Sequence, residues 1–142
     1  MMTEDQQKLL QKLYAQQKAT ESGIEIIQER IELVQASLNS HRRGLGVLQG
    51  FEEKKEGEKM LISVGGNIFI DVQLANPDRV ARDIGSGVRI VQNLEDAKKS
   101  VEETIASLEQ HYAQLAQQHE AISNQAADVG KRLGDLVKQM QG

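Results

Sequence analysis

A heptad pattern in two long segments constrains the fold of this chain more than any other feature. The first series, spaced alternately three and four positions apart, comprises Leu10, Leu13, Gln17, Thr20, Ile24, Ile27, Ile31, Val34, Leu38, His41, Leu45 and Leu48. The second comprises Leu94, Lys98, Val101, Ile105, Leu108, Tyr112, Leu115, His119, Ile122, Ala126, Val129, Leu133, Leu136 and Met140. Such a repeat is typical of helices that pack together as a coiled coil.

The residues in front of each series favour helix starts. Thr3 and Gln6 have the spacing of a capping box, and Asn93 can cap the second helix. We therefore predict helices over residues 4–48 and 94–140. At a rise of ~1.5 Å per residue, each helix would be roughly 60 to 70 Å long.

Between the two series the pattern changes from helical to alternating. Runs rich in β-formers, at residues 59–64 and 68–74, flank Gly65-Gly66-Asn67. A second pair, at residues 79–84 and 88–92, flanks Gly85-Ser86-Gly87. Glycine accepts the positive φ of a tight turn, so this region predicts two consecutive β-hairpins. Isolated hairpins are marginally stable and have open edges, and we expect these to pair with strands of other chains.

The fold class that follows is α+β and predominantly helical: a long antiparallel two-helix coiled coil with two central β-hairpins. We predict a single domain over residues 1–142, with one helical segment at 1–48, the hairpins at 49–92 and the second helical segment at 93–142. The low aromatic content, 3% of 142 residues, also disfavours an ordinary globular core.

Composition excludes several classes of function. The chain has no cysteine, which rules out disulfides and Cys-based zinc sites. Its net charge of -4 argues against nucleic-acid binding. The acidic start and the absence of a long apolar run favour a cytosolic protein that does not cross a membrane.

No enzyme motif is complete. Gly85-Ser86-Gly87 begins like a dinucleotide fingerprint, but Ile90 stands where a small residue is needed. The run from His119 to Ser123 begins like a zincin motif but lacks the second His. We expect no catalytic residues, no bound metal and no cofactor.

The polar positions of the two series suggest a register for the helix pair. In an antiparallel helix pair, the residue numbers of two facing positions add up to the same sum along the whole pair. If that sum is 139, Thr20 lies opposite His119 and His41 lies opposite Lys98. A shift of one heptad in either direction would place these polar residues against apolar ones, which is costly when they are buried unpaired. We therefore expect the register in which polar positions meet.

That register leaves one end of the coil apolar and open. Leu133 falls opposite Gln6, Leu136 opposite Thr3, and Met140 has no partner. The apolar side chains at or near this end, which could form a ligand-binding tip, are Met1, Met2, Leu9, Leu10, Leu13, Tyr14, Leu133, Leu136, Val137 and Met140. Frayed helix ends without a function, or contact with a neighbouring chain, would explain the same residues equally well.

Taken together, these features resemble the alpha-type subunits of archaeal prefoldin. The resemblance covers essentially the whole chain and is most specific in Asn76-Pro77-Asp78-Arg79-Val80 and in the segment from Asp83 to Val88. It implies a hexamer of two alpha and four beta-type subunits, held by a β-barrel platform built from the hairpins. It also implies that the apolar side chains named above, at the tip of the coil, bind non-native polypeptide clients without ATP, and that the complex delivers these clients to a group II chaperonin.

The resemblance places assembly in residues 59–74 and 79–92. The assembly residues expected are Leu61, Ile62, Val64, Ile68, Ile70, Val72, Val80, Ile84, Val88 and Ile90. Asp71 departs from this apolar pattern and must face solvent or a subunit interface.

Two functions remain open: a holding chaperone with many clients, or a coiled-coil scaffold that docks one defined protein partner.

Overall fold

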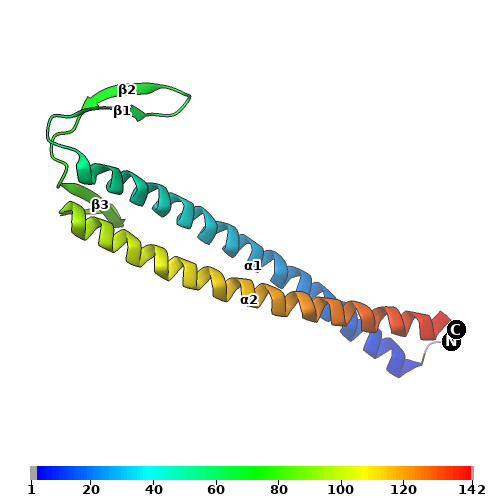
Figure 1. The fold of residues 1–142 in the computed structure, drawn as a ribbon. Coiled ribbons are helices and arrows are strands. Elements are labelled where there is room, and N and C mark those ends of the chain that lie inside the picture. The colour runs from blue at the N-terminus through cyan, green and yellow to red at the C-terminus, as the bar shows by residue number, and fades with distance from the viewer. Residues whose placement is uncertain (1–2, 142) are drawn as a thin grey trace. The chain divides into compact units, whose positions relative to one another are not determined.

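The computed structural model describes residues 3–141, and within them the chain forms two long helices separated by two hairpins (Figure 1). The elements in chain order are α1 (Glu4–Gly50), the short 3-10 helix η1 (Phe51–Glu53), β1 (Lys59–Ser63), β2 (Phe69–Gln73), β3 (Val80–Gly85), β4 (Val88–Gln92) and α2 (Leu94–Gln141). The predicted order of helices and hairpins is confirmed.

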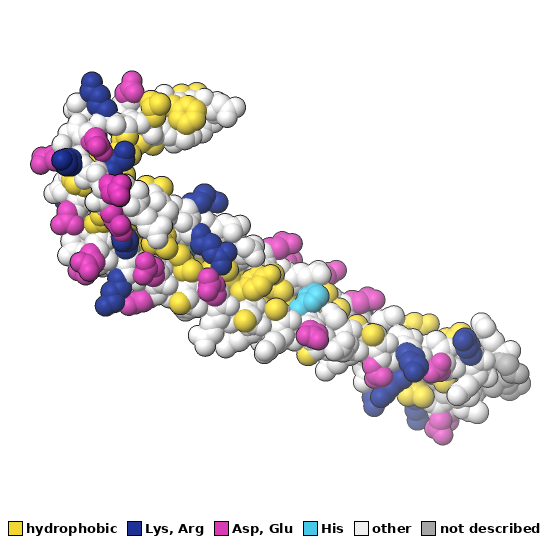
Figure 2. Space-filling view, in the orientation of Figure 1, with side chains coloured by type: hydrophobic (Ala, Val, Ile, Leu, Met, Phe, Trp, Pro, Cys, Tyr) yellow, Lys and Arg dark blue, Asp and Glu magenta, His cyan; other side chains and the backbone are white. Residues whose placement is uncertain are grey.

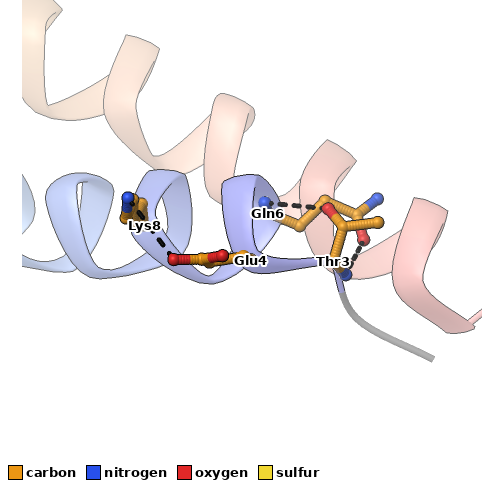
Figure 3. Close-up of polar contacts among 4 residues, drawn as sticks. All are labelled: Thr3, Glu4, Gln6 and Lys8. Atoms are coloured by element: carbon orange, nitrogen blue, oxygen red, sulfur yellow. Dashed lines mark hydrogen bonds and ion pairs between the residues drawn. The ribbon is translucent and has the colours of Figure 1, made fainter.

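Both predicted helix caps are present. At the start of α1, the Gln6 backbone N–H donates to Thr3 Oγ1 and the Thr3 N–H donates to Gln6 Oε1, each over 3.1 Å (Figure 3). At the start of α2, the Asp96 N–H donates to Asn93 Oδ1 over 2.8 Å. Each cap satisfies backbone donors that have no partner inside the helix.

The heptad pattern is also confirmed, because every position of both series is buried or half-buried in the structure. The most deeply covered positions include Leu13, Leu38 and Leu115, which are 4%, 3% and 2% exposed. The residues between them along each helix are mostly exposed. Burial of this one stripe, rather than intrinsic helix propensity, is therefore what stabilises helices of 47 and 48 residues.

The chain divides into two compact units. The first, which we call the coil unit, contains α1 up to Ala36 and α2 from Glu109. Its two helical segments are antiparallel neighbours. The second, the hairpin unit, spans Ser37–Leu108 and contains both hairpins together with the adjoining ends of the helices.

Each hairpin is a two-stranded antiparallel sheet. In the first, Ile62 pairs with Ile70, and Gly65, Gly66 and Asn67 take positive φ in the turn. In the second, Asp83 pairs with Arg89, and a register shift follows before the turn that contains Gly85-Ser86-Gly87. The predicted turns are confirmed, including the positive φ that glycine favours.

The register of the coil unit differs from the prediction by one heptad. The Cδ1 methyl of Ile122 occupies the place that a Cβ on Gly23 would take. Gln28 Nε2 lies 3.4 Å from His119 Nε2. The residue numbers add up to 145 in the first pair and to 147 in the second. Facing residues therefore have numbers that sum to about 146, instead of the predicted 139.

The predicted register is wrong because Thr20 and His41 each have a hydrogen-bond partner in their own helix. The Thr20 hydroxyl donates to the Gln17 carbonyl of its own helix over 2.9 Å. His41 Nδ1 lies 2.7 Å from the Ser37 carbonyl, also in its own helix. These groups are satisfied locally, so placing them opposite apolar residues carries little of the penalty for an unpaired polar group.

The contact between Gly23 and Ile122 leads to a first prediction. Gly23→Ala should raise the free energy of unfolding by clearly less than ~1 kcal/mol, because moving the terminal methyl of Ile122 offsets part of the gain in helix propensity. Gly44→Ala is the matched control, since its Cβ would meet no atom within 4 Å, and it should raise stability by up to ~1 kcal/mol. Urea unfolding at fixed protein concentration measures both. Equal stabilisation by the two substitutions would contradict the packing of Ile122 on Gly23.

Candidate functional site

The end of the coil unit that carries the chain termini holds a compact apolar cluster. We call it the distal end and define it as residues 4–14 of α1 with residues 129–141 of α2. Leu13, Val129, Leu133 and Leu136 are buried there, at 4%, 8%, 6% and 6% exposure, and Leu10 and Met140 pack against them. The numbers of Leu13 and Leu133 sum to 146, as do those of Leu10 and Leu136, in agreement with the shifted register.

The expectation that Leu133 and Leu136 face water is therefore wrong. It rested on Gln6 and Thr3 as their partners, whereas the observed cluster covers them with apolar neighbours from α1. Leu13 is buried in the same cluster, and Met140 is half-buried. Of the other residues expected here, Met1 and Met2 lie outside the described residues.

Two large hydrophobic side chains of the distal end do face solvent. Leu9 is 45% exposed and Tyr14 is 54% exposed, and both flank the heptad positions Leu10 and Leu13 on α1. Val137 of α2 is half-buried. The distal end of the closed coil thus presents a small apolar surface, and behind it lies a larger one that becomes accessible only if the helices separate.

Charge at the distal end is mixed. Glu4 pairs with Lys8 over 3.6 Å, and Arg132 pairs over 3.2 Å with Asp128, the residue just before the α2 part of the distal end; each pair lies along one helix and is well exposed. Such pairs contribute little to stability. Positive and negative side chains are mixed on this surface, so its charge does not select a partner of one opposite charge.

The first hairpin has an apolar face. Neighbouring residues of a strand point to opposite faces. Met60 and Ile62 of β1 therefore share a face with their cross-strand partners Val72 and Ile70. Asp71 lies on the other face, opposite Leu61, and is exposed as expected. Figure 2 shows hydrophobic side chains gathered over this hairpin.

The second hairpin is fastened to α2 by one of its faces. Gln92 Nε2 donates to Ser100 Oγ of α2 over 3.3 Å, and Arg82 Nη1 donates to Gln92 Oε1 over 3.1 Å. Val80 and Ile90, on the same face, are half-buried. The opposite face, which carries Val91 at 56% exposure, is left free within the described chain.

Polar contacts tie the connections between hairpins to the helix ends. Asp78 Oδ1 accepts the Leu94 N–H over 3.0 Å at the first residue of α2. The Asp78 N–H in turn donates to Asn76 Oδ1 over 2.9 Å, which closes the turn at Pro77. An ion pair joins Glu52 of η1 to Lys98 of α2. Asp78 could not be recognised as a cap from the sequence, since it lies 16 residues before the helix start that it caps.

Most of the predicted assembly residues are exposed in this single chain. Those that are at least 42% exposed are Leu61, Ile62, Val64, Ile68, Ile70, Ile84 and Val88. The remaining three, Val72, Val80 and Ile90, are half-buried. Large hydrophobic residues on open strands are usually covered in a protein assembly, because unpaired edges and apolar patches promote association.

No group of three or more His, Cys, Asp or Glu within residues 3–141 is placed to hold a metal ion. None of the helices described is both long and apolar enough to cross a lipid bilayer.

Comparison with known proteins assigns the chain to a class. A family model described as Prefoldin subunit matches residues 20–139. The chain therefore belongs to the prefoldin family of chaperone subunits. A filamentous PFD from Methanocaldococcus jannaschii, solved by cryo-EM, has the same fold with a TM-score of 0.67 and 22% identity, over 81% of this chain and 95% of that one.

Within the family, the chain is similar to archaeal alpha subunits, which supports the predicted resemblance. It is 30% identical over 89 residues to prefoldin subunit alpha of Archaeoglobus fulgidus, covering 58% of this chain and 65% of the relative. It is 32% identical over 77 residues to that of Methanobrevibacter smithii, covering 54% and 52%. The match thus spans between half and two thirds of these relatives' length.

Proposed function

We propose that this chain is a subunit of an ATP-independent holding chaperone that captures non-native polypeptides at its distal end. The observation that carries the proposal is the exposure of Leu9 and Tyr14 beside a buried apolar cluster, on a surface of mixed charge. Non-native chains share exposed hydrophobic residues and little else. An adaptable apolar surface without a charge pattern therefore suits many clients.

Assembly supports the same proposal. The exposed hydrophobic residues of the hairpins are suited to pairing with other subunits, and we infer a complex of two such alpha-type chains with four beta-type subunits. Several weak distal ends on one platform would raise the avidity for a client by ~100-fold or more when their spacing matches it. We further propose that the complex acts in the cytosol, without enzymatic activity, and passes clients to a group II chaperonin.

Capture can be tested at the residues that are exposed in the closed coil. Leu9→Ser with Tyr14→Ser should reduce the suppression of aggregation several-fold, because it removes apolar contact area without opening the buried cluster. The assay measures light scattering of several unrelated denatured proteins in the presence of the assembled complex. Circular dichroism and the size of the complex should remain those of the parent.

A matched control uses exposed hydrophobic residues of α1 that lie outside the distal end. Ile26 and Leu33 are 50% and 72% exposed, and Ile26→Ser with Leu33→Ser should leave suppression unchanged. Equal losses in the two double variants would contradict capture at the distal end. Loss for only one client among several would instead support the scaffold that docks one defined partner.

Assembly is tested separately on the first hairpin. Ile68→Asp with Ile70→Asp should yield monomers or low oligomers, because an interface that covers these positions would bury unpaired charge. Native mass spectrometry with a co-expressed beta-type subunit measures the size. Ile26→Asp with Leu33→Asp adds the same charge outside the hairpins and should leave the complex intact. A complex of parent size with the hairpin variant would contradict the assembly surface.

A further inference from the structure

The second hairpin is tied at its base to the start of α2. β4 ends at Gln92 and α2 begins at Leu94, so a single residue joins them. The other strand, β3, begins two residues after Asp78, whose Oδ1 accepts the Leu94 N–H over 3.0 Å. Both strands are therefore connected over a short distance to the first residue of α2, which leaves the base of this hairpin little freedom to turn.

Further along, side-chain hydrogen bonds join both strands of this hairpin to α2. We call them the polar relay and define it as Arg82 of β3, Gln92 of β4 and Ser100 of α2. Arg82 Nη1 donates to Gln92 Oε1 over 3.1 Å, and Gln92 Nε2 donates to Ser100 Oγ over 3.3 Å. All three residues are half-buried, and Ala97, about one turn before Ser100, is fully covered at 0% exposure. Water therefore competes less for these hydrogen bonds than on an open surface.

The relay depends on Gln92. The guanidinium of Arg82 can only donate, so it requires the amide oxygen of Gln92, and the amide nitrogen is then left to donate to the Ser100 hydroxyl. The two ends of one side chain thus connect β3 to α2. Gln92 has a positioning role, because the opposite face of the hairpin is the one that carries the exposed Val91.

The first hairpin is attached differently. Among the described residues, the hydrogen bonds and ion pairs of residues 54–74 join only residues of the segment 51–74. Both faces of this hairpin are open, since Leu61 on one face is 64% exposed and Ile62 on the other is 42% exposed. Few buried contacts are typical of segments that move at a low cost in free energy.

This difference affects strand pairing between subunits. When a strand joins an open edge, the hairpin that carries the edge must be ordered, and the entropy of that ordering opposes binding. The relay already holds the second hairpin on α2, whereas the first hairpin must be ordered as it pairs. The edges of the second hairpin should therefore bind more tightly, although both hairpins expose large hydrophobic residues.

We propose that the second hairpin, held by the polar relay, is the primary docking edge for a strand of another prefoldin subunit, and that the first hairpin pairs only afterwards. The inference rests on the assembly that forms part of the proposed function, and it adds the order of the two contacts. Gln92 is the positioning residue of the contact that forms first.

Charge substitutions on the two hairpins separate these contacts. Val88→Asp with Val91→Asp changes residues that are 52% and 56% exposed in the chain, and it should leave only monomers because the first hairpin alone pairs too weakly. Ile68→Asp with Ile70→Asp should instead leave a low oligomer, paired through the second hairpin. Native mass spectrometry of each full chain with a co-expressed beta-type subunit measures the species. Circular dichroism verifies that both variants remain folded.

The relay is tested by the rate of assembly, followed by light scattering after mixing with the beta-type subunit. Gln92→Met keeps the length of the side chain but removes both hydrogen bonds, and it should slow assembly about fivefold without changing the final size. Gln92→Glu should keep the parent rate, because its carboxylate can accept from Arg82 and from the Ser100 hydroxyl. Gln73→Met is the matched control and should also keep that rate, since Gln73 ends β2 as Gln92 ends β4 but is exposed.

Hydrogen exchange of the full chain before mixing gives a readout that does not depend on assembly. In the parent, amides of β3 and β4 should be more protected than those of β1 and β2, because the relay holds the second hairpin. Gln92→Met should reduce this difference, whereas Gln73→Met should not. Equal protection of the two hairpins in the parent would overturn the role of the relay.

The outcomes distinguish this inference from the proposed function. A parent chain that forms no complex with a beta-type subunit would contradict the assembly itself. Low oligomers in the Val88 and Val91 variant, with monomers in the Ile68 and Ile70 variant, would overturn the order of the contacts and leave the assembly standing. Equal slowing by Gln92→Met and Gln92→Glu would overturn the relay, since the second substitution keeps its hydrogen bonds.

Discussion

The helix register, marked by the packing of Ile122 against Gly23, is the constraint on which the rest of the coil unit depends. A two-helix coiled coil with a heptad repeat can slide by seven residues and still bury its stripe, so something other than the repeat must select the register. A close approach at a glycine is such a device, because a Cβ on residue 23 would occupy the place of the Ile122 Cδ1 methyl and force that side chain to move. Once this layer is fixed, Leu133 meets Leu13 and Leu136 meets Leu10, and the distal end closes.

Much of the fold could be predicted from the sequence because it rests on local signals. The heptads, the caps at Thr3 and Asn93, and the glycine turns each act within a few residues. The register could not be predicted from polar matching, because Thr20 is satisfied inside its own helix. An isolated glycine in the middle of a strong helical pattern, Gly23, was the signal that could have revealed it. The exposure of Leu133 was mispredicted as a direct consequence.

The structure separates two apolar surfaces with different physical character. The hairpins expose large hydrophobic residues such as Phe69, at 59%, on strands with open edges, where backbone pairing can define a partner and a register. Among the large hydrophobic residues of the distal end, only Leu9 and Tyr14 are exposed, whereas Leu13, Val129, Leu133 and Leu136 are buried in the closed helix pair. This division suits a subunit that assembles permanently through one surface and binds transiently through the other. Keeping the larger patch covered also limits self-association of free distal ends.

A cysteine cross-link measures the register most directly, because the chain has no cysteine of its own. Thr20→Cys with Ala126→Cys, whose numbers sum to 146, should form an intrachain disulfide in the assembled protein under mild oxidation. Thr20→Cys with His119→Cys, whose numbers sum to 139, should not, since one heptad displaces the partner by about 10 Å along the helix. Preferential formation of the second disulfide would contradict the register, and with it the burial of Leu133 and Leu136.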